Sequence, residues 1–460
     1  MHTRHLQHHR HPLRTRSLLV TAALCGLACF GHGRLAHAVE VTDVLDAFDD
    51  ENNDPFDGSL RLRFTSETRN AGIGRQVRCL KNDALGEPCP GGSGFVLARE
   101  LEYARVRNTM NFDFRVGLYK DIELYAVLPY VISDDWNHKF SPGVGPQNST
   151  IQPFQDKING TAGDRSALFK AAYQSTARSG LGDMHLGLKW APFNYYRDAS
   201  DPTWVFNIDY TAPTGTAMKA DNDGVGYGLH ELTLATTISR RALRLFEPFF
   251  NVHVTPLRSG SSGGLFTRRG PTQNFVEPGT TLGTQFGVAL VPWENIKQDE
   301  RFEVETGVGF DYTYRGREYT EIWESLASPS NPCKPSEGCS NVLHSMSELD
   351  PVTGKPRRTD GITEVEPYAR FQGWAALHYQ PIQYFQLSAR IAYARETPHF
   401  ITYGDVGKDL DGRDKVSAFN SNGQNEFSPV YLPAVDTVGQ RLRVLDVSNI
   451  VMQFAISGKF

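Results

Sequence analysis

Apolar residues alternate with polar or small ones along many short stretches of this chain. In RFEVETGVGFDYTYR, residues 301–315, most even positions from Phe302 to Tyr314 are apolar or aromatic, and the odd positions from Glu303 on are charged, Gly or Thr. A helix would spread Glu303 and Glu305 over different faces, whereas a strand places them on one face and the aromatic residues on the other. The alternation therefore predicts strands with one apolar and one polar face.

The same period of two recurs throughout the chain. It is found in MNFDFRVGL (110–118), TWVFNIDYTA (203–212), TLGTQFGVALVP (281–292), QLSARIAYAR (386–395) and VMQFAISGKF (451–460). No uninterrupted apolar run after the N-terminal leader approaches the ~20 residues of a transmembrane helix. The mean hydropathy of −0.40 resembles that of a soluble protein. Alternation makes this average uninformative, because the two faces of each strand cancel.

The alternating stretches predict about twelve strands. The connections between successive strands are alternately short and long. We expect these at 59–66, 97–118, 122–131, 182–191, 203–213, 229–238, 246–255, 280–292, 301–315, 364–379, 384–395 and 442–460. Aromatic residues flank most of the short turns, as at Tyr119, Trp190, Trp293 and Tyr379. An even number of strands, short turns on one rim, long loops on the other and an aromatic girdle are typical of an outer-membrane barrel.

We therefore predict an all-β fold, in which residues 59–460 form a transmembrane antiparallel β-barrel with long extracellular loops. A pair of secreted β-sandwiches is the alternative, since it also produces alternation. It does not explain why long and short connections take turns. The predicted location is the outer membrane of a Gram-negative bacterium, with its lipid as a partner.

The last strand ends on Phe460, with Ile450, Met452, Phe454 and Ile456 on one face. It resembles the signature by which bacterial outer-membrane barrels are recognised for insertion, although Gly458 stands where another apolar residue is usual. The resemblance implies the outer-membrane insertion machinery as a partner.

The first 38 residues have the pattern of a secretory signal peptide: a basic start, the apolar run SLLVTAALCGLACF and Ala36-His37-Ala38. The four later cysteines form two close pairs, Cys79 with Cys89 and Cys333 with Cys339. In an exported chain such pairs predict disulfides, here within two long loops. Four unrelated thiols are the alternative, and no His lies at zinc-ligand spacing.

Residues 39–58, VEVTDVLDAFDDENNDPFDG, form an acidic periplasmic segment before the barrel. Val41, Val44, Leu45 and Phe48 have helical spacing, which is consistent with a short amphipathic helix that plugs the lumen or docks at the periplasmic mouth. A disordered acidic leader explains the composition equally well.

Charged residues on the polar strand faces are candidates for lining a pore, which would need polar walls. The candidates are Arg115, Glu123, Lys189, Asp209, Glu303, Glu305, Asp311, Arg370 and Arg390. The alternative is that these charges pair with each other and fill a closed barrel. A register error of one residue would move the whole set to the other face.

No enzymatic motif is convincing, and we expect no enzyme and no cofactor. Ser421-Asn422-Gly423 resembles part of the His-x-Ser-Asn-Gly stretch of an outer-membrane phospholipase family, but Phe419 replaces the His that would accept the serine proton. Asp409, Asp411 and Asp414 in KDLDGRD resemble half of a calcium loop, although Asp and Gly are also ordinary turn residues. The net charge of −5 gives no argument for a nucleic-acid partner.

Three segments resemble one known family. SGLGDMHLGLKW (179–190), IDYTAPTG (208–215) and IELYAVLPYV (122–131) are similar in order and spacing to the outer-membrane transporters of the MetA-pathway of phenol degradation family. The resemblance covers roughly residues 110–255, with the closing Phe strand. It implies a channel or transporter for small, hydrophobic or aromatic molecules. A structural or surface-interaction barrel whose long loops are the functional part is the alternative.

Overall fold

The computed structural model describes most of the barrel. It covers residues 42–45, 47, 57–78, 94–151, 168–195, 197–220, 222–242, 245–260, 276–295, 298–327, 344–349, 356–413, 415–417, 419–424, 426–428 and 430–460. The predicted signal peptide and all four loop cysteines, Cys79, Cys89, Cys333 and Cys339, lie outside the described residues. Among the described residues no helix is long and apolar enough to cross a membrane.

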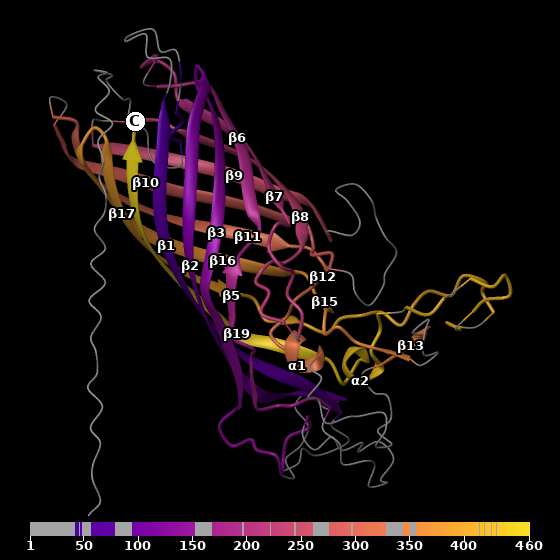
Figure 1. The fold of residues 1–460 in the computed structure, drawn as a ribbon. Helices are drawn as coiled ribbons and strands as arrows, with labels where there is room; N and C mark the ends of the chain where they lie inside the picture. The colour runs from indigo at the N-terminus through magenta and orange to yellow at the C-terminus, as the bar shows by residue number, and fades with distance from the viewer. Residues whose placement is uncertain are drawn as a thin grey trace, which may run out of the picture.

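Twelve strands of the described chain form one closed antiparallel barrel (Figure 1). They are β1 (Gly58–Arg78), β2 (Phe95–Tyr119), β3 (Ile122–Phe140), β6 (Met184–Phe193), β7 (Thr203–Ala212), β8 (Leu229–Ser239), β9 (Phe246–Gly260), β10 (Thr281–Asn295), β11 (Glu300–Thr313), β16 (Tyr368–Ile382), β17 (Phe385–Glu396) and β19 (Leu442–Lys459). Each pairs with the next along the chain, and β19 pairs back with β1 from Ser59–Lys459 to Arg75–Leu442. This closure confirms the barrel and excludes the pair of sandwiches.

Smaller elements occupy the long-loop end. β4 (Tyr173–Gln174) and β5 (Arg178–Leu181) pair with β3, β18 (His399–Phe400) pairs with β19, and two short ladders join β12 (Gly316–Glu318) to β15 (Thr363–Val365) and β13 (His344–Leu349) to β14 (Pro356–Arg358). The helices α1 (Trp323–Ala327) and α2 (Pro433–Asp436) are one turn each. Figure 1 shows both helices at this end, opposite the rim that holds the C-terminus.

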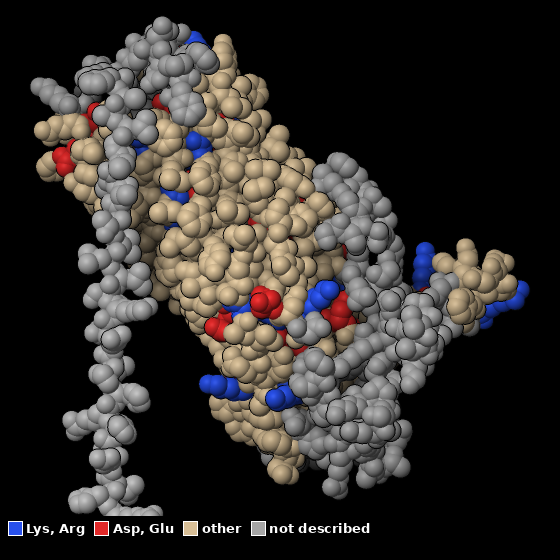
Figure 2. All heavy atoms as spheres, in the orientation of Figure 1, with Lys and Arg blue, Asp and Glu red and all other residues tan. Residues whose placement is uncertain are grey.

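The outer wall is apolar, as the alternation predicts. Phe286, Val308, Phe371 and Phe454 are all more than half exposed, and each stands on a different strand. In the view of Figure 2 the wall between the rims is largely uncharged, and charged side chains gather toward the long-loop end. A closed barrel with an apolar exterior satisfies its backbone groups within the sheet and places this protein in the outer membrane of a Gram-negative cell.

Aromatic side chains ring the short-turn rim, where the sequence predicts a girdle. Trp190, Phe193 and Trp204 are exposed and lie close together, with ring centroids of Phe193 and Trp204 6.1 Å apart. Tyr119 is exposed at the β2–β3 turn and Trp293 at the β10–β11 turn. Rings of this kind sit at the headgroup level of a bilayer.

The three N-terminal strands are longer than predicted. The expected end of the first strand at residue 66 is wrong, because β1 continues to Arg78, and β3 continues to Phe140 rather than Val131. The extra segments carry charges that resemble loop sequence. The strand conformation persists because these charges are paired, as in Arg105 with Asp134 at 2.6 Å.

A buried apolar cluster, which we call the cap, fills the long-loop end. Ile151, Phe169, Ile322, Leu326 and Val435 come from three different loops, and each is at most 1 % exposed. They pack against buried side chains of β1, β2 and β3. Beside the cap, the fully buried side chains of Arg178 and Glu324 form an ion pair at 2.9 Å. The hydrophobic core of this barrel therefore lies at its extracellular end.

Candidate functional site in the barrel lumen

All nine charged residues that the alternation assigned to the polar face lie on the inner side of the wall. They are Arg115 on β2, Glu123 on β3, Lys189 on β6, Asp209 on β7, Glu303, Glu305 and Asp311 on β11, Arg370 on β16 and Arg390 on β17. The register of each strand pair keeps them there, because neighbours such as Phe302 and Val304 face outward. Whether these residues line a conducting passage stays a prediction.

The first group lies near the short-turn rim. The Arg115 guanidinium donates to both carboxylate oxygens of Glu123, at 2.8 and 2.6 Å. Lys189 Nζ lies 3.5 Å from Glu123 Oε1. The Glu123 side chain is fully buried. Two cations and one anion in a buried site call for further negative charge.

That charge comes from the N-terminal segment. Asp43 Oδ2 accepts from Arg115 at 3.0 Å, and the backbone oxygen of Asp43 accepts from Arg115 at 2.9 Å and from Lys189 at 3.2 Å. Leu45 N donates to Glu123 Oε2 at 2.8 Å, and Leu45 is 5 % exposed. We call residues 42–45 and 47 the inner segment. None of these residues is helical, so the helical spacing does not produce a helix within the described part of residues 39–58.

Burial by itself would raise the pKa of the Asp43 carboxyl. The charges of Lys459, Arg115 and Lys189 outweigh burial and hold this pKa well below its usual range. Asp43 is therefore a carboxylate at any ordinary pH, and the contact with Arg115 is a charge-assisted hydrogen bond.

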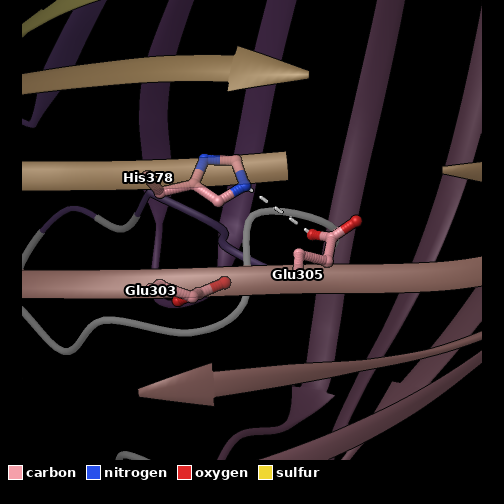
Figure 3. Close-up of side chains that lie close together, drawn as sticks. All are labelled: Glu303, Glu305 and His378. Atoms are coloured by element: carbon pink, nitrogen blue, oxygen red, sulfur yellow. Dashed lines mark ion pairs between the residues drawn. The ribbon is translucent and has the colours of Figure 1, made fainter. Parts of the chain in front are cut away.

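A second group joins β11 to β16. The buried side chains of Glu303, Glu305 and His378 offer ligand atoms that lie within 4.8 Å of one another. Figure 3 shows the three side chains converging, with His378 Nε2 3.9 Å from Glu305 Oε2. One His and two carboxylates are a ligand set that suits a divalent ion such as Zn²⁺. Arg301 Nη2 already donates to Glu303 Oε2 at 2.7 Å, and Trp374 Nε1 donates to Glu305 Oε1 at 2.6 Å. One oxygen of each carboxylate is therefore already hydrogen-bonded to the protein and is less available to a metal ion.

Two further inward carboxylates pair with groups that the sequence analysis did not select. Asp209 accepts from Tyr125 Oη at 2.8 Å, and His185 Nδ1 lies 3.4 Å away. His253 Nε2 lies 3.2 Å from Asp311 Oδ1. His185 and His253 stand at inward positions of β6 and β9, so extending the two-residue register to uncharged polar residues would have found them.

A cavity of 190 Å³ lies against β16, β17 and β19. Its walls are formed by Arg370, Gln372, Arg390, Ala392, Ala394, Asn449, Val451 and Gln453. Two of the nine predicted residues, Arg370 and Arg390, therefore share one space inside the barrel. Donors predominate among the polar groups, since two guanidinium groups and three carboxamides face it.

The two loop motifs lie outside the lumen. Asp409 and Asp411 come close to Glu426, with carboxylate oxygens within 4.8 Å of one another, while Asp414 lies outside the described residues. Asp409 Oδ1 accepts from the backbone of Asp411 and Gly412, at 3.2 and 2.7 Å, which is turn chemistry. Ser421 lies in the same loop, where its backbone N donates to Asp411.

Neither the family models nor the curated proteins contain a match to this chain. Among solved structures it is similar to an outer membrane channel from Pseudomonas putida F1, at 10 % identity over 87 % of this chain and 95 % of that one, with a TM-score of 0.38. A FadL homologue of Pseudomonas aeruginosa is similar at 9 % identity, with 88 % and 90 % of the chains covered and a TM-score of 0.30. The TodX monoaromatic hydrocarbon channel (deltaS2 mutant) gives the same identity, coverage and TM-score.

Proposed function

We propose that this protein is a passive channel for small molecules across the outer membrane, and not an enzyme. The observation that carries the proposal is the 190 Å³ cavity with a largely polar wall, inside a closed barrel. A barrel that serves only as a scaffold gains nothing from an unfilled polar cavity, because its inward charges would be more stable fully paired. Twelve strands leave a narrow lumen, so the solutes are small.

The substrate class is part of the same proposal: small molecules with a hydrophobic or aromatic body. It is supported by the family resemblance of residues 110–255 and by the apolar part of the cavity wall, which consists of Ala392, Ala394 and Val451.

We propose further that the inner segment narrows the short-turn end of this passage. Its contacts support this, because Thr42 Oγ1 lies 2.9 Å from Ser239 Oγ on β8 while Asp43 bonds to Arg115 on β2. A chain that bonds to β2 and β8 at the same time crosses the lumen. The acidic character of residues 39–58 then has a reason, since Lys459, Arg115 and Lys189 act on Asp43 at this level.

We propose two partners for this barrel. Outer-membrane lipid contacts the apolar wall, and we propose that the insertion machinery recognises β19 with its terminal Phe460. That residue is 64 % exposed at the rim, where a partner can reach it.

Conductance of the purified full-length protein in planar bilayers tests the proposal. We expect discrete current steps in salt solution and swelling of proteoliposomes in small neutral solutes. An absence of current and swelling, for the full chain and for a chain that starts at residue 57, would contradict it.

A structural or surface-interaction barrel is the second candidate, and the cap favours it. Ile322, Leu326 and Val435 close the extracellular end with packed apolar side chains. This candidate predicts a barrel that folds in lipid and stays electrically silent.

A further inference from the structure

Arg370 and Arg390 differ from the other inward arginines. Arg115 and Arg301 each bond to a buried carboxylate within 2.7 Å. The described part of the chain gives neither Arg370 nor Arg390 a hydrogen bond or an ion pair. Arg370 Nε is buried and without a hydrogen-bond partner.

The two carboxylates that stand opposite Arg370 in the sheet lie closer to other residues than to Arg370. Asp311 stands directly opposite on β11, but its carboxylate lies 3.2 Å from His253. Glu396 stands opposite on β17, but it accepts from Arg69 at 2.7 Å. Arg370 therefore has no ion-pair partner among the described residues, and its charge reaches Glu396 only at longer range.

Arg390 contacts an aromatic ring rather than an acid. Its guanidinium carbon lies 5.0 Å from the centre of the Trp374 ring, and the residues opposite it are Ala376 and Gln453. This stacking orients the plane of the guanidinium and leaves its N–H groups available to the cavity.

A third residue that lines the cavity, Asn449, also has a side-chain atom that is not hydrogen-bonded to the described residues. Asn449 Nδ2 donates to Glu67 at 2.7 Å, while the buried Oδ1 of Asn449 has no hydrogen-bond partner among the described residues. The cavity thus presents two arginines that form no ion pair with the described residues, side-chain amides and an apolar strip of Ala392, Ala394 and Val451.

We propose that this cavity is a subsite for a small organic anion: a carboxylate carried by an apolar body of about one ring. An arginine fork matches a carboxylate with two parallel hydrogen bonds, and a partly buried, unpaired guanidinium gains more from such a partner than an exposed one does. The size agrees, because a cavity of about 150 Å³ accommodates benzene, and this one measures 190 Å³. The inference deepens the proposed function and rests on it, since it names the class of solute that the channel selects.

The test compares benzoate with benzamide, which has the same ring and no charge. Calorimetric titration of the full-length protein in detergent measures binding without any need for transport. We expect benzoate to bind about tenfold or more tightly than benzamide, the difference that a charge-assisted bond supplies. Equal affinity of the two would overturn the subsite.

Variants then locate the binding. Arg370→Gln combined with Arg390→Gln should abolish the preference for benzoate over benzamide. In a salt gradient the reversal potential of this double variant should also shift in the direction that indicates greater cation selectivity. Arg395→Gln is the matched control, because Arg395 lies on β17 but faces outward and is exposed. The proposal fails if the double variant, shown to be folded by its heat-modifiable gel migration, keeps the preference of the wild type. If the double variant does not fold, the benzoate and benzamide comparison on the wild type decides.

The two proposals fail in different ways. Benzoate binding without any bilayer current would keep the subsite and remove the channel. Current without charge preference, and with equal binding of benzoate and benzamide, would keep the channel and remove the subsite.

Discussion

Gly58 N donates to Phe460 O at 2.7 Å, and Phe460 N donates to Gly58 O at 2.9 Å. The last residue of the chain is thus bonded to the first residue of β1, and it forms the end of the seam that closes the barrel. The terminal aromatic is a structural part of the sheet as well as a residue of the rim.

Deletion of Phe460 should therefore weaken closure. Two backbone hydrogen bonds are lost, worth about 1 kcal/mol each in water and more beside lipid. We expect a lower folded fraction after refolding into lipid vesicles, measured by heat-modifiable gel migration. Gly458→Ala is the control, because an added Cβ meets nothing within 4 Å there. A folded fraction equal to that of the wild type would show that the seam does not need its last residue.

Large inward rings lie over glycines of the neighbouring strand. A Cβ on Gly307 would come within 2.3 Å of the Trp374 ring, whose Nε1 is fixed by Glu305 at 2.6 Å. We expect Gly307→Ala to destabilise the barrel by about 1–3 kcal/mol, the usual cost of overpacking. Denaturant unfolding in lipid vesicles measures this. At the outward Gly373 the nearest atom would be 3.7 Å away, so Gly373→Ala should change little.

Much of this architecture is predictable from the sequence, for a physical reason. A residue on a barrel strand faces either lipid or the lumen, so the period of two assigned Glu303 and Arg390 to the inner face without knowledge of their partners. The number of strands followed from turns such as Lys120-Asp121, where Asp121 takes a φ of 51° that suits a tight turn.

The parts that the sequence did not predict depend on contacts between distant segments. Asp43 meets Arg115 across 72 positions, and no local pattern indicates that pairing. The cap is similar, because Ile151, Ile322 and Val435 lie in loops whose composition resembles that of ordinary surface loops. The length of β1 was underestimated because Arg69 is paired with Glu321 and Glu396, which its neighbours in sequence do not show.

The register can be tested with two adjacent residues. Phe286 is 57 % exposed on the outer face of β10, and Gln285 faces inward. Phe286→Arg should cost about 2–4 kcal/mol, because it places a charge in the hydrocarbon of the bilayer. Gln285→Arg should cost much less, since the lumen is polar. If unfolding in lipid vesicles ranks the two variants the other way, the assignment of faces is wrong for this strand.

The loop between β17 and β19 should be less stable at neutral pH than in mild acid. Burial raises the pKa of the Asp436 carboxyl, on α2, to about 6. The folded loop therefore binds a proton that the unfolded loop releases near pH 3.8, so stability falls as the pH rises between these two values. Hydrogen exchange of residues 430–440 should slow toward pH 4, after correction for intrinsic rates, by at most about tenfold per pH unit. Asp436→Asn should remove this dependence, and a dependence that survives would assign it to another group.

Release of the inner segment should open the short-turn end of the lumen. Asp43→Asn removes the carboxylate that accepts from Arg115 at 3.0 Å, and leaves Arg115 and Lys189 with Glu123 as their only carboxylate partner among the described residues. We expect a larger single-channel conductance in planar bilayers, approaching that of a chain that starts at residue 57. Asp198→Asn is the control, since Asp198 is exposed in a short turn and its side chain bonds only to Ser200 among the described residues.

The pH dependence gives a second check on the same contact. Because the pKa of Asp43 is held below its usual range, its stabilising charge is fully present above about pH 4 and is lost only as the pH falls through the lowered value. The wild-type conductance should therefore not rise between about pH 8 and pH 4 through release of the segment. A step near pH 6 that disappears in Asp43→Asn would mean that the carboxylate is not held by Lys459, Arg115 and Lys189 in the membrane, and the inner segment would then be a loose occupant of the lumen.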